Sequence, residues 1–165
     1  MTDDANMTAN DLAKAIIKLA TDKRVMLVLA ESCTGGMIAA ALTDIAGSSA
    51  VLDRGLVTYS NQAKQDLVGV AEETLIAHGA VSEEVAAEMA VGGCRHSTDG
   101  AIAVGLTGIA GPGGGSSAKP VGLVYIAVAD TARCTVIKHH FDGDRTAVRS
   151  AAVAAALAHI SDFIG

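Results

Sequence analysis

A serine in a sharp turn is the first feature of this sequence that could do chemistry. Ser32 lies in the segment Ala-Glu-Ser-Cys-Thr-Gly-Gly of residues 30–36, between an apolar run and an apolar helical stretch. Such a turn presents its side chains at the edge of a sheet where α/β proteins bind ligands, and the helix N-terminus supplies free N–H groups. A hydroxyl there can attack a carbonyl carbon while the amides stabilise the oxyanion. The simpler alternative is that Ser32 or Thr34 caps the helix.

Three nearby or downstream residues bear on this chemistry. Cys33 is a rival nucleophile, but a catalytic cysteine needs a positive neighbour such as histidine, and the histidines are remote in the sequence. A buried structural thiol is the simpler interpretation of Cys33. Lys64 can act as a general base if burial lowers its pKa; otherwise it is a solvated lysine on a short helix. Tyr59 can stack on a cationic ring or cover the core.

A glycine-rich stretch and an arginine indicate how a ligand would be held. Residues 107–115 follow an apolar run, and their glycines let backbone N–H groups approach a ligand closely. The stretch is not a P-loop, because no Gly-Lys-Ser/Thr ends it. Arg145 starts the last predicted helix, where it can bind a phosphate or pair with a neighbouring aspartate. His139 and His140 would point to opposite faces of a strand, so we expect no metal.

The elements that must position these residues alternate between strands and helices, as in an α/β fold. We predict strands at residues 25–30, 51–60, 101–106, 121–129 and 133–141, with a hairpin between the last two. We predict helices at about residues 10–22, 36–45, 61–69, 72–78, 82–96 and 142–163. Residues 107–117 are expected to form a long loop. We find no internal repeat, so we expect one domain over residues 1–165, with a loose start at 1–10.

The composition excludes several classes of protein. Hydrophobic residues make up 50% and charged residues 18% of the chain, which favours a sizeable core over disorder. The net charge of −6, without a basic cluster, argues against nucleic-acid binding. The three cysteines show no CxxC spacing, so neither a disulfide framework nor a zinc site is indicated. We see no signal peptide and no apolar run of membrane-spanning length, and therefore expect a cytoplasmic protein without membrane contact.

Seven motifs, in this order, resemble the CinA C-terminal domain family, the nicotinamide mononucleotide deamidases. They lie at residues 30–36, 44–49, 58–64, 78–82, 107–112, 119–122 and 143–145. The resemblance runs from about residue 10 to the end of the chain. It implies a three-layer α/β/α fold with a mixed, mostly parallel sheet of about five strands. It also implies hydrolysis of nicotinamide mononucleotide to nicotinic acid mononucleotide and ammonia. Larger members carry an ADP-ribose pyrophosphatase domain, which we expect this chain to lack.

With this resemblance we predict catalytic roles for two side chains. Ser32 is the nucleophile, and Lys64 is the base that takes its proton. Backbone amides would stabilise the oxyanion of the tetrahedral intermediate. The residues that we expect to supply them are Thr34, Gly35, Gly36, Thr107 and Gly108.

The remaining predictions concern the substrate and its alternatives. Tyr59 would lie against the pyridinium ring and Arg145 would hold the 5′-phosphate. Ser49 would bind substrate, orient Lys64 or replace Ser32 as nucleophile. The chemistry needs no cofactor and no metal. The alternatives are a non-catalytic nucleotide-binding module and an amidase for another small amide, and the alanine-rich helices could form a homo-oligomer interface.

Overall fold

A mixed five-stranded sheet forms the centre of the computed structural model, which describes residues 7–97 and 100–165. Its strands are β1 (Leu27–Glu31), β2 (Leu52–Val57), β3 (Ile102–Gly108), β4 (Leu123–Ala129) and β5 (Cys134–His140), in the order β2-β1-β3-β4-β5. β1 pairs in parallel with β2 and β3, whereas β4 pairs antiparallel with β3 and β5. β4 therefore runs against the other four strands. This confirms the predicted mostly parallel sheet and the hairpin between the last two strands.

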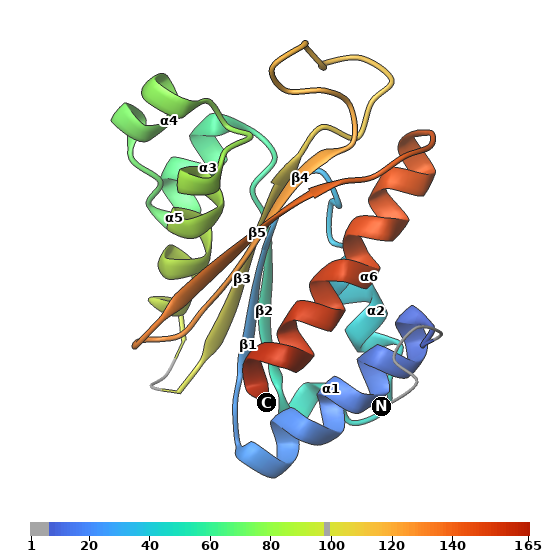
Figure 1. The fold of residues 1–165 in the computed structure, drawn as a ribbon. Helices are drawn as coiled ribbons and strands as arrows, with labels where there is room; N and C mark the ends of the chain where they lie inside the picture. Colours follow the sequence, from blue (N-terminus) through green and yellow to red (C-terminus); the bar gives the residue numbers. More distant parts are fainter. Residues whose placement is uncertain (1–6, 98–99) are drawn as a thin grey trace.

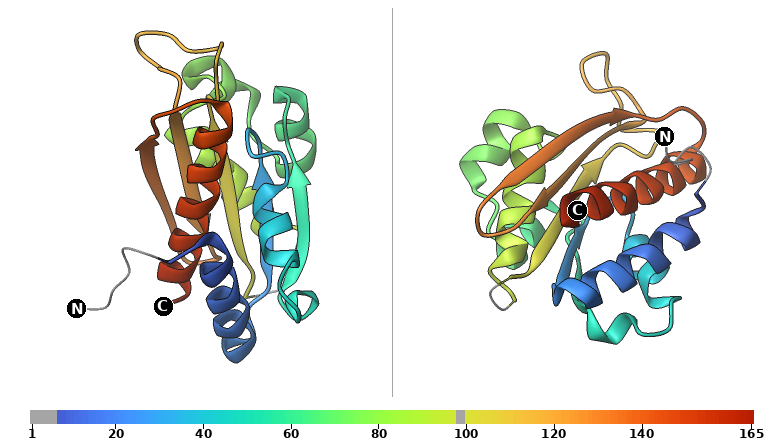
Figure 2. Two further views of the ribbon diagram at one scale, coloured as in Figure 1. Left: turned by 90° about the vertical axis from the view of Figure 1, so that its right-hand side faces the viewer. Right: turned by 60° about the horizontal axis from the view of Figure 1, so that its bottom comes forward.

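Helices cover both faces of this sheet (Figure 1). One layer contains α1 (Ala9–Lys23), α2 (Met37–Thr43) and α6 (Arg145–Ile164), and the other contains α3 (Asn61–Val68), α4 (Glu72–His78) and α5 (Glu83–Cys94). A single 3₁₀ turn, η2 (Ser48–Ala50), precedes β2. Two further views show the same separation into layers (Figure 2). The predicted three-layer α/β/α architecture is confirmed.

Side-chain caps begin two of the helices that flank the edge of the sheet. Ser82 Oγ accepts the N–H of Val85 (3.3 Å) at the start of α5. Asp144 Oδ1 accepts the N–H of Ala147 (2.9 Å) at the start of α6. Each cap satisfies an N–H that has no partner inside its helix. The cap at Asp144 makes Arg145 the first residue of α6.

The buried centre of the sheet agrees with the apolar runs in the sequence. All five residues of β1 are buried, as expected for a strand covered on both faces. The edge strands β2 and β5 are largely exposed. The largest core cluster joins the sheet to α1, α2 and α6 through residues such as Leu29, Leu106 and Leu157. Because β1, β2 and β3 are parallel, their C-terminal ends lie at the same edge of the sheet.

The length of α6 corrects one expectation from the sequence. This 20-residue helix is long and apolar enough to cross a membrane by length and composition, whereas we predicted no apolar run of that length. Its apolar side chains have a role in the fold, because Val148, Leu157, Ile160 and five others are buried. The core of the domain therefore accounts for the apolar character of α6.

Several strand ends differ from the predictions by up to three residues, and two of these ends lie near the edge of the sheet where β1 ends. β3 continues through Thr107 and Gly108, which pair with β4, so the predicted loop begins only at Ile109. The sequence could not reveal this, because the pairing partner lies in a distant segment. β2 ends at Val57, before the predicted end at residue 60, because Ser60 caps α3 instead.

Candidate active site

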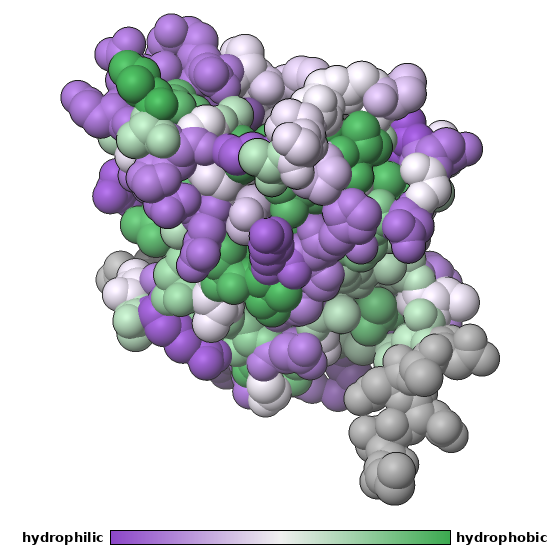
Figure 3. All heavy atoms as spheres, turned by 45° about the horizontal axis from the view of Figure 1, so that its top comes forward, coloured by the Kyte–Doolittle hydropathy of each residue, from purple (hydrophilic) through white to green (hydrophobic). Residues whose placement is uncertain are grey.

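A pocket of about 260 Å³ opens at the edge of the sheet where β1 and β3 end. The glycine-rich loop that follows β3 projects above this edge (Figure 1). Hydrophilic and apolar residues are interspersed on the face seen when this edge is turned toward the viewer (Figure 3). The predicted site residues that line the pocket are Ser32, Tyr59, Lys64, Thr107, Gly108 and Arg145. The fold thus brings together residues that are spread over most of the chain.

Ser32 and Lys64 meet inside this pocket. Lys64 Nζ lies 3.1 Å from Ser32 Oγ and also donates to the carbonyl oxygens of Thr58 (2.8 Å) and Tyr59 (3.3 Å). Only 1% of Lys64 is exposed, and this burial lowers its pKa. A neutral amine has two N–H bonds and one lone pair. It can therefore donate to both carbonyls while its lone pair accepts the Ser32 hydroxyl proton.

Local structure around α3 delivers Lys64 to this position. The N–H of Thr58 donates to the carbonyl of Glu31 (2.9 Å), which carries the chain past the end of β1. Ser60 then caps α3, its Oγ accepting the N–H of Ala63 (3.0 Å). Lys64 lies in the first turns of this helix, on the side that faces β1. The solvated-lysine alternative is therefore wrong for Lys64.

Glu31 is a residue whose importance the sequence analysis did not recognise. It is 1% exposed, and its Oε1 accepts the hydroxyl of Thr34 (2.7 Å) and the N–H of Ile38 (2.9 Å). Its Oε2 accepts the N–H of Ala39 (3.1 Å). A carboxylate at a helix N-terminus is favoured by the helix dipole. Glu31 thereby fastens the turn after Ser32 to α2; its one sequence signal is an acidic residue at the end of a buried strand.

The other predicted residues of this turn do not line the pocket. Thr34 is fully buried, with its hydroxyl donated to Glu31. Gly35 and Gly36 have φ values of 60° and 100°, a left-handed conformation that favours glycine. The N–H of Gly35 donates to the carbonyl of Ser32 (3.0 Å). That N–H is therefore already hydrogen-bonded within the turn and is not available to a ligand.

Ser49 lies at the opposite edge of the sheet. It belongs to η2, which leads into the N-terminal end of β2, and the following Val51 accepts the N–H of Leu27 at the start of β1. Ser32 follows the other end of β1, about 16 Å away by the usual rise per residue of a strand. The structure therefore does not bring Ser49 to Ser32 and Lys64 within one chain.

Cys33 is buried next to the candidate nucleophile. Only 6% of the residue is exposed, and burial raises the pKa of its thiol to about 11. A thiol with this pKa is protonated near neutral pH, and the thiolate is the reactive form. The environment therefore favours the interpretation of Cys33 as a structural residue.

Arg145 connects two walls of the pocket. Its guanidinium donates to the carbonyl of Gly111 in the glycine-rich loop (2.6 Å) and to the hydroxyl of Tyr59 (3.1 Å). Both side chains are exposed at the mouth. Among the described residues, no acidic side chain lines the pocket, and the Arg145 guanidinium carries a positive charge at its mouth. This composition suits a ligand that carries an anionic group.

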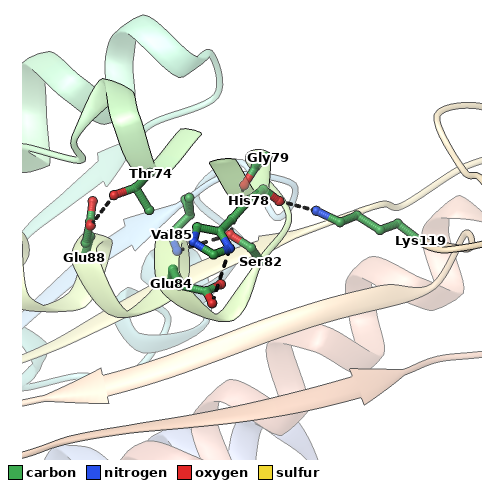
Figure 4. A network of polar contacts seen from close by, with 8 residues as sticks. All are labelled: Thr74, His78, Gly79, Ser82, Glu84, Val85, Glu88 and Lys119. Atoms are coloured by element: carbon green, nitrogen blue, oxygen red, sulfur yellow. Dashed lines mark hydrogen bonds and ion pairs between the residues drawn. The ribbon is translucent and has the colours of Figure 1, made fainter. Parts of the chain in front are cut away.

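Polar contacts fasten the rim of the pocket to α4 and α5 (Figure 4). Lys119, which follows the glycine-rich stretch, donates to the carbonyl of His78 at the end of α4. Ser82 donates to the carbonyl of Gly79 (2.9 Å). The hydroxyl of Thr107 donates to the carbonyl of Ala80 (2.8 Å), a residue that itself lines the pocket. Thr107 therefore contributes to the shape of the wall through its backbone contact.

Outside the pocket, the described residues include a histidine pair but no metal-ligand cluster. In residues 7–97 and 100–165, no cluster of three or more His, Cys, Asp or Glu side chains could hold a metal ion. His139 lies 2.7 Å from His159, measured between their Nε2 atoms, where β5 meets α6. The chemistry that the described geometry offers is therefore that of a buried serine and lysine beside backbone amides.

Known proteins resemble this chain over most of its length. The model of the CinA C-terminal domain matches residues 9–164. The chain belongs to the CinA C-terminal domain family. One member, named nicotinamide-nucleotide amidohydrolase PncC, from Escherichia coli strain K12, is 50% identical over 159 residues, which cover 95% of this chain and 93% of that protein. A protein of the same name from Enterobacter agglomerans is 55% identical over 137 residues, which cover 82% of this chain and 83% of that protein.

Solved structures of CinA family members share the fold. A competence/damage-inducible protein from Agrobacterium tumefaciens has a TM-score of 0.88 and 48% identity, covering 93% of this chain and 96% of the other. A CinA superfamily protein from Enterobacter cloacae has a TM-score of 0.92 and 31% identity, and the match covers 100% of this chain and 97% of the other. Some CinA relatives are much longer: this chain spans 36% of a CinA-like protein from Geobacter sulfurreducens, at 50% identity over 148 residues.

Proposed function

We propose that this chain hydrolyses the carboxamide of nicotinamide mononucleotide, releasing nicotinic acid mononucleotide and ammonia. The observation that carries the proposal is the 3.1 Å approach of Lys64 Nζ to Ser32 Oγ in the pocket at the sheet edge. The two relatives named nicotinamide-nucleotide amidohydrolase, each matched over most of its length, support the choice of substrate.

In the first half of the reaction, Ser32 Oγ attacks the carbon of the carboxamide. The hydroxyl proton passes to the lone pair of Lys64 Nζ, and a tetrahedral intermediate with an oxyanion forms. When the intermediate collapses, Lys64 returns the proton to the departing nitrogen. The C–N bond breaks, ammonia leaves, and the nicotinoyl group stays on Ser32 as an ester.

The N–H of Gly108 is the oxyanion donor that the strand register favours. Leu106 accepts the N–H of Ser32 (3.0 Å), so its backbone faces β1, whereas Ile109 donates to β4 (2.9 Å). Backbone groups alternate in direction along a strand, so those of Gly108 face the Ser32 side. A Cβ at Gly108 would lie 2.7 Å from Val124 Cγ2, which explains the need for glycine.

The turn after Ser32 is the second source of donors. Because the N–H of Gly35 is bonded to the Ser32 carbonyl and Gly36 does not line the pocket, we assign this role to the N–H of Thr34, which follows the pocket-lining Cys33. Oxyanion donors of this kind stabilise the charge that develops in the transition state by several kcal/mol, about 3 per donor.

In the second half, a water molecule attacks the ester carbon while neutral Lys64 accepts a proton from that water. The bond to Ser32 Oγ breaks, the serine regains a proton from Lys64, and the acid product releases its own proton to solvent and leaves as the carboxylate. Arg145 holds the phosphate throughout, because its guanidinium lies at the mouth and retains N–H groups beyond those given to Gly111 and Tyr59. Tyr59 as a residue is 58% exposed, and its ring offers a face to the pyridinium.

The setting of the reaction is part of the proposal. We assign the activity to a single amidohydrolase domain over residues 1–165 that works without cofactor or metal. Cys33, Cys94 and Cys134 are free thiols, which suits a reducing cytoplasm. Ile76 is 78% exposed, and apolar side chains of this kind can form contacts between copies of the chain.

Ammonia release from a panel of amides tests the proposal. The panel contains nicotinamide mononucleotide, nicotinamide riboside, nicotinamide and unrelated small amides, with Ser32→Ala as the inactive variant and Ser150→Ala, an exposed serine of α6, as the matched control. We expect one ammonia and one nicotinic acid mononucleotide per mononucleotide consumed. Binding without ammonia release would identify a nucleotide-binding module instead. Preferential release from another amide would identify a different amidase.

A further inference from the structure

Arg149 of α6 holds the backbone directly after the candidate nucleophile. Its Nε donates to the carbonyl of Cys33 (3.0 Å) and its Nη2 donates to the carbonyl of Thr34 (3.2 Å). A planar guanidinium bonded to two successive carbonyls fixes both peptide planes at once. Because the peptide group is planar and trans, the N–H groups of the same two planes are directed away from α6.

The turn needs such an anchor because of its sequence. Gly35 and Gly36 follow in left-handed conformations, and glycine has more backbone freedom to lose than any other residue. Glu31 fastens the α2 side of the turn through Thr34, Ile38 and Ala39. The carbonyl of Thr34 also accepts the N–H of Met37 at the start of α2 (3.1 Å), and Arg149 bonds both to it and to the carbonyl of Cys33.

The two arginines of α6 contact different parts of the protein. Arg145 and Arg149 are four residues apart, which puts them on one face of the helix. Arg145 lines the pocket and contacts its mouth, whereas Arg149 is half-buried and contacts the carbonyls behind Ser32. A substrate can reach the first guanidinium, but the second is committed to the protein backbone.

We propose that Arg149 is a positioning residue that holds Ser32 Oγ against Lys64 Nζ and keeps the N–H of Thr34 directed away from α6. This inference rests on the proposed function in that Ser32 must be the nucleophile. It assigns to Arg149 an effect on the reactivity of Ser32 and no contact with the substrate.

The inference predicts a specific kinetic signature. Arg149→Ala lowers kcat by about tenfold to a hundredfold, the scale expected when a nucleophile is displaced by about 1 Å. KM changes little, because substrate contacts remain. Arg149→Lys recovers part of the rate, since an ammonium can reach one carbonyl but cannot bridge two. Arg145→Ala shows the opposite pattern: KM rises, whereas kcat changes little.

Arg133→Ala is the matched control for a merely structural role. Arg133 Nη2 donates to the carbonyl of Phe163 (2.7 Å) at the far end of α6, and its guanidinium lies over the Phe163 ring. It is thus another arginine that ties the same helix to a neighbouring segment. We expect Arg133→Ala to lower the melting temperature while the reactivity of Ser32 in the folded protein stays at the wild-type level.

A fluorophosphonate probe reads out Ser32 without the natural substrate. The probe forms a bond between Ser32 Oγ and phosphorus as fluoride leaves and Lys64 Nζ takes the hydroxyl proton. The adduct is counted by mass spectrometry of the intact protein. We expect rapid labelling of the wild type and Arg133→Ala, about tenfold or more slower labelling of Arg149→Ala, and none of Ser32→Ala.

The outcomes separate this inference from the proposed function. Slow labelling of Arg149→Ala in a protein that does not hydrolyse nicotinamide mononucleotide would uphold the inference and reject the substrate. Equal labelling of Arg149→Ala and wild type would overturn the inference, even if the mononucleotide is hydrolysed. Loss of labelling in Arg133→Ala to the same degree, or an unlabelled Ser32 in the wild type, would also overturn it.

Discussion

Lys64 Nζ lies 3.1 Å from Ser32 Oγ, although the two residues are 32 positions apart and belong to different elements. Ser32 follows the central strand β1, and Lys64 comes from α3, which begins after the edge strand β2. The parallel pairing of β1 with β2 brings both chain segments to one edge of the sheet. The lysine is buried there, so its charge is disfavoured at the point where a base is needed.

The first prediction concerns the identity of the nucleophile. Ser32→Ala should abolish ammonia release and leave the circular dichroism spectrum unchanged. Cys33→Ala should keep most of the activity, because burial raises the pKa of the Cys33 thiol to about 11 and keeps it protonated. An inactive Cys33→Ala beside an active Ser32→Ala would show that the cysteine carries the reaction.

The second prediction concerns the base. Since burial lowers the pKa of Lys64, kcat should fall as the pH drops and the amine becomes protonated. Lys64→Arg should be inactive at saturating substrate, because arginine stays charged at every accessible pH. Lys64→Ala should be inactive as well. If Lys64 only attracted the anionic phosphate, Lys64→Arg would retain substantial turnover, so the kcat of this variant distinguishes a base from a binding residue.

The third prediction concerns the phosphate. Nicotinamide riboside should be a much poorer substrate than the mononucleotide, and Arg145→Ala should remove most of this difference. A hydrogen bond to a charged group contributes about 1.5–3 kcal/mol, which corresponds to roughly ten- to a hundredfold in kcat/KM. Measuring kcat/KM for the riboside and the mononucleotide with wild type and Arg145→Ala gives the coupling free energy between the Arg145 side chain and the phosphate. Equal turnover of riboside and mononucleotide by the wild type would exclude phosphate recognition.

Local patterns in the sequence predicted most of the fold. The apolar run that forms β1 and the Ser82 and Asp144 caps depend on neighbouring residues, so their elements are visible in the sequence. The last two residues of β3 were assigned to a loop because their pairing with β4 is a tertiary event. The β-propensity of a segment does not show which distant segment its residues will pair with.

The predicted site depends on tertiary contacts to a greater degree. A short polar helix favoured a solvated Lys64, and only the fold shows that the side chain is 1% exposed. Glu31 and Arg149 were overlooked because each acts on a turn through hydrogen bonds that no spacing reveals. Ser49 matched a motif but lies at the other end of the sheet, which shows that motif membership does not give position.

The last prediction uses stability to test the pKa of Lys64 without any substrate. The folded pKa of Lys64 is lower than that of the exposed lysine in the unfolded chain, about 10.4. Between these two values the unfolded chain binds more protons, so the free energy of unfolding rises with pH. Lys64 therefore destabilises the protein most below its folded pKa, and this cost disappears above the unfolded pKa. Methionine has a similar length and no charge, so Lys64→Met removes that cost at every pH.

The melting temperature of Lys64→Met relative to wild type should therefore be more favourable at pH 7 than at pH 10. The variant also loses three hydrogen bonds, to Ser32 Oγ and to the carbonyls of Thr58 and Tyr59, but this loss does not vary with pH. Lys14→Met is the control, because Lys14 is an exposed lysine of α1 and its replacement should give a nearly constant difference. A difference for Lys64→Met that stays constant between pH 7 and pH 10 would show that the pKa is not lowered, and the general-base role would lose its physical basis.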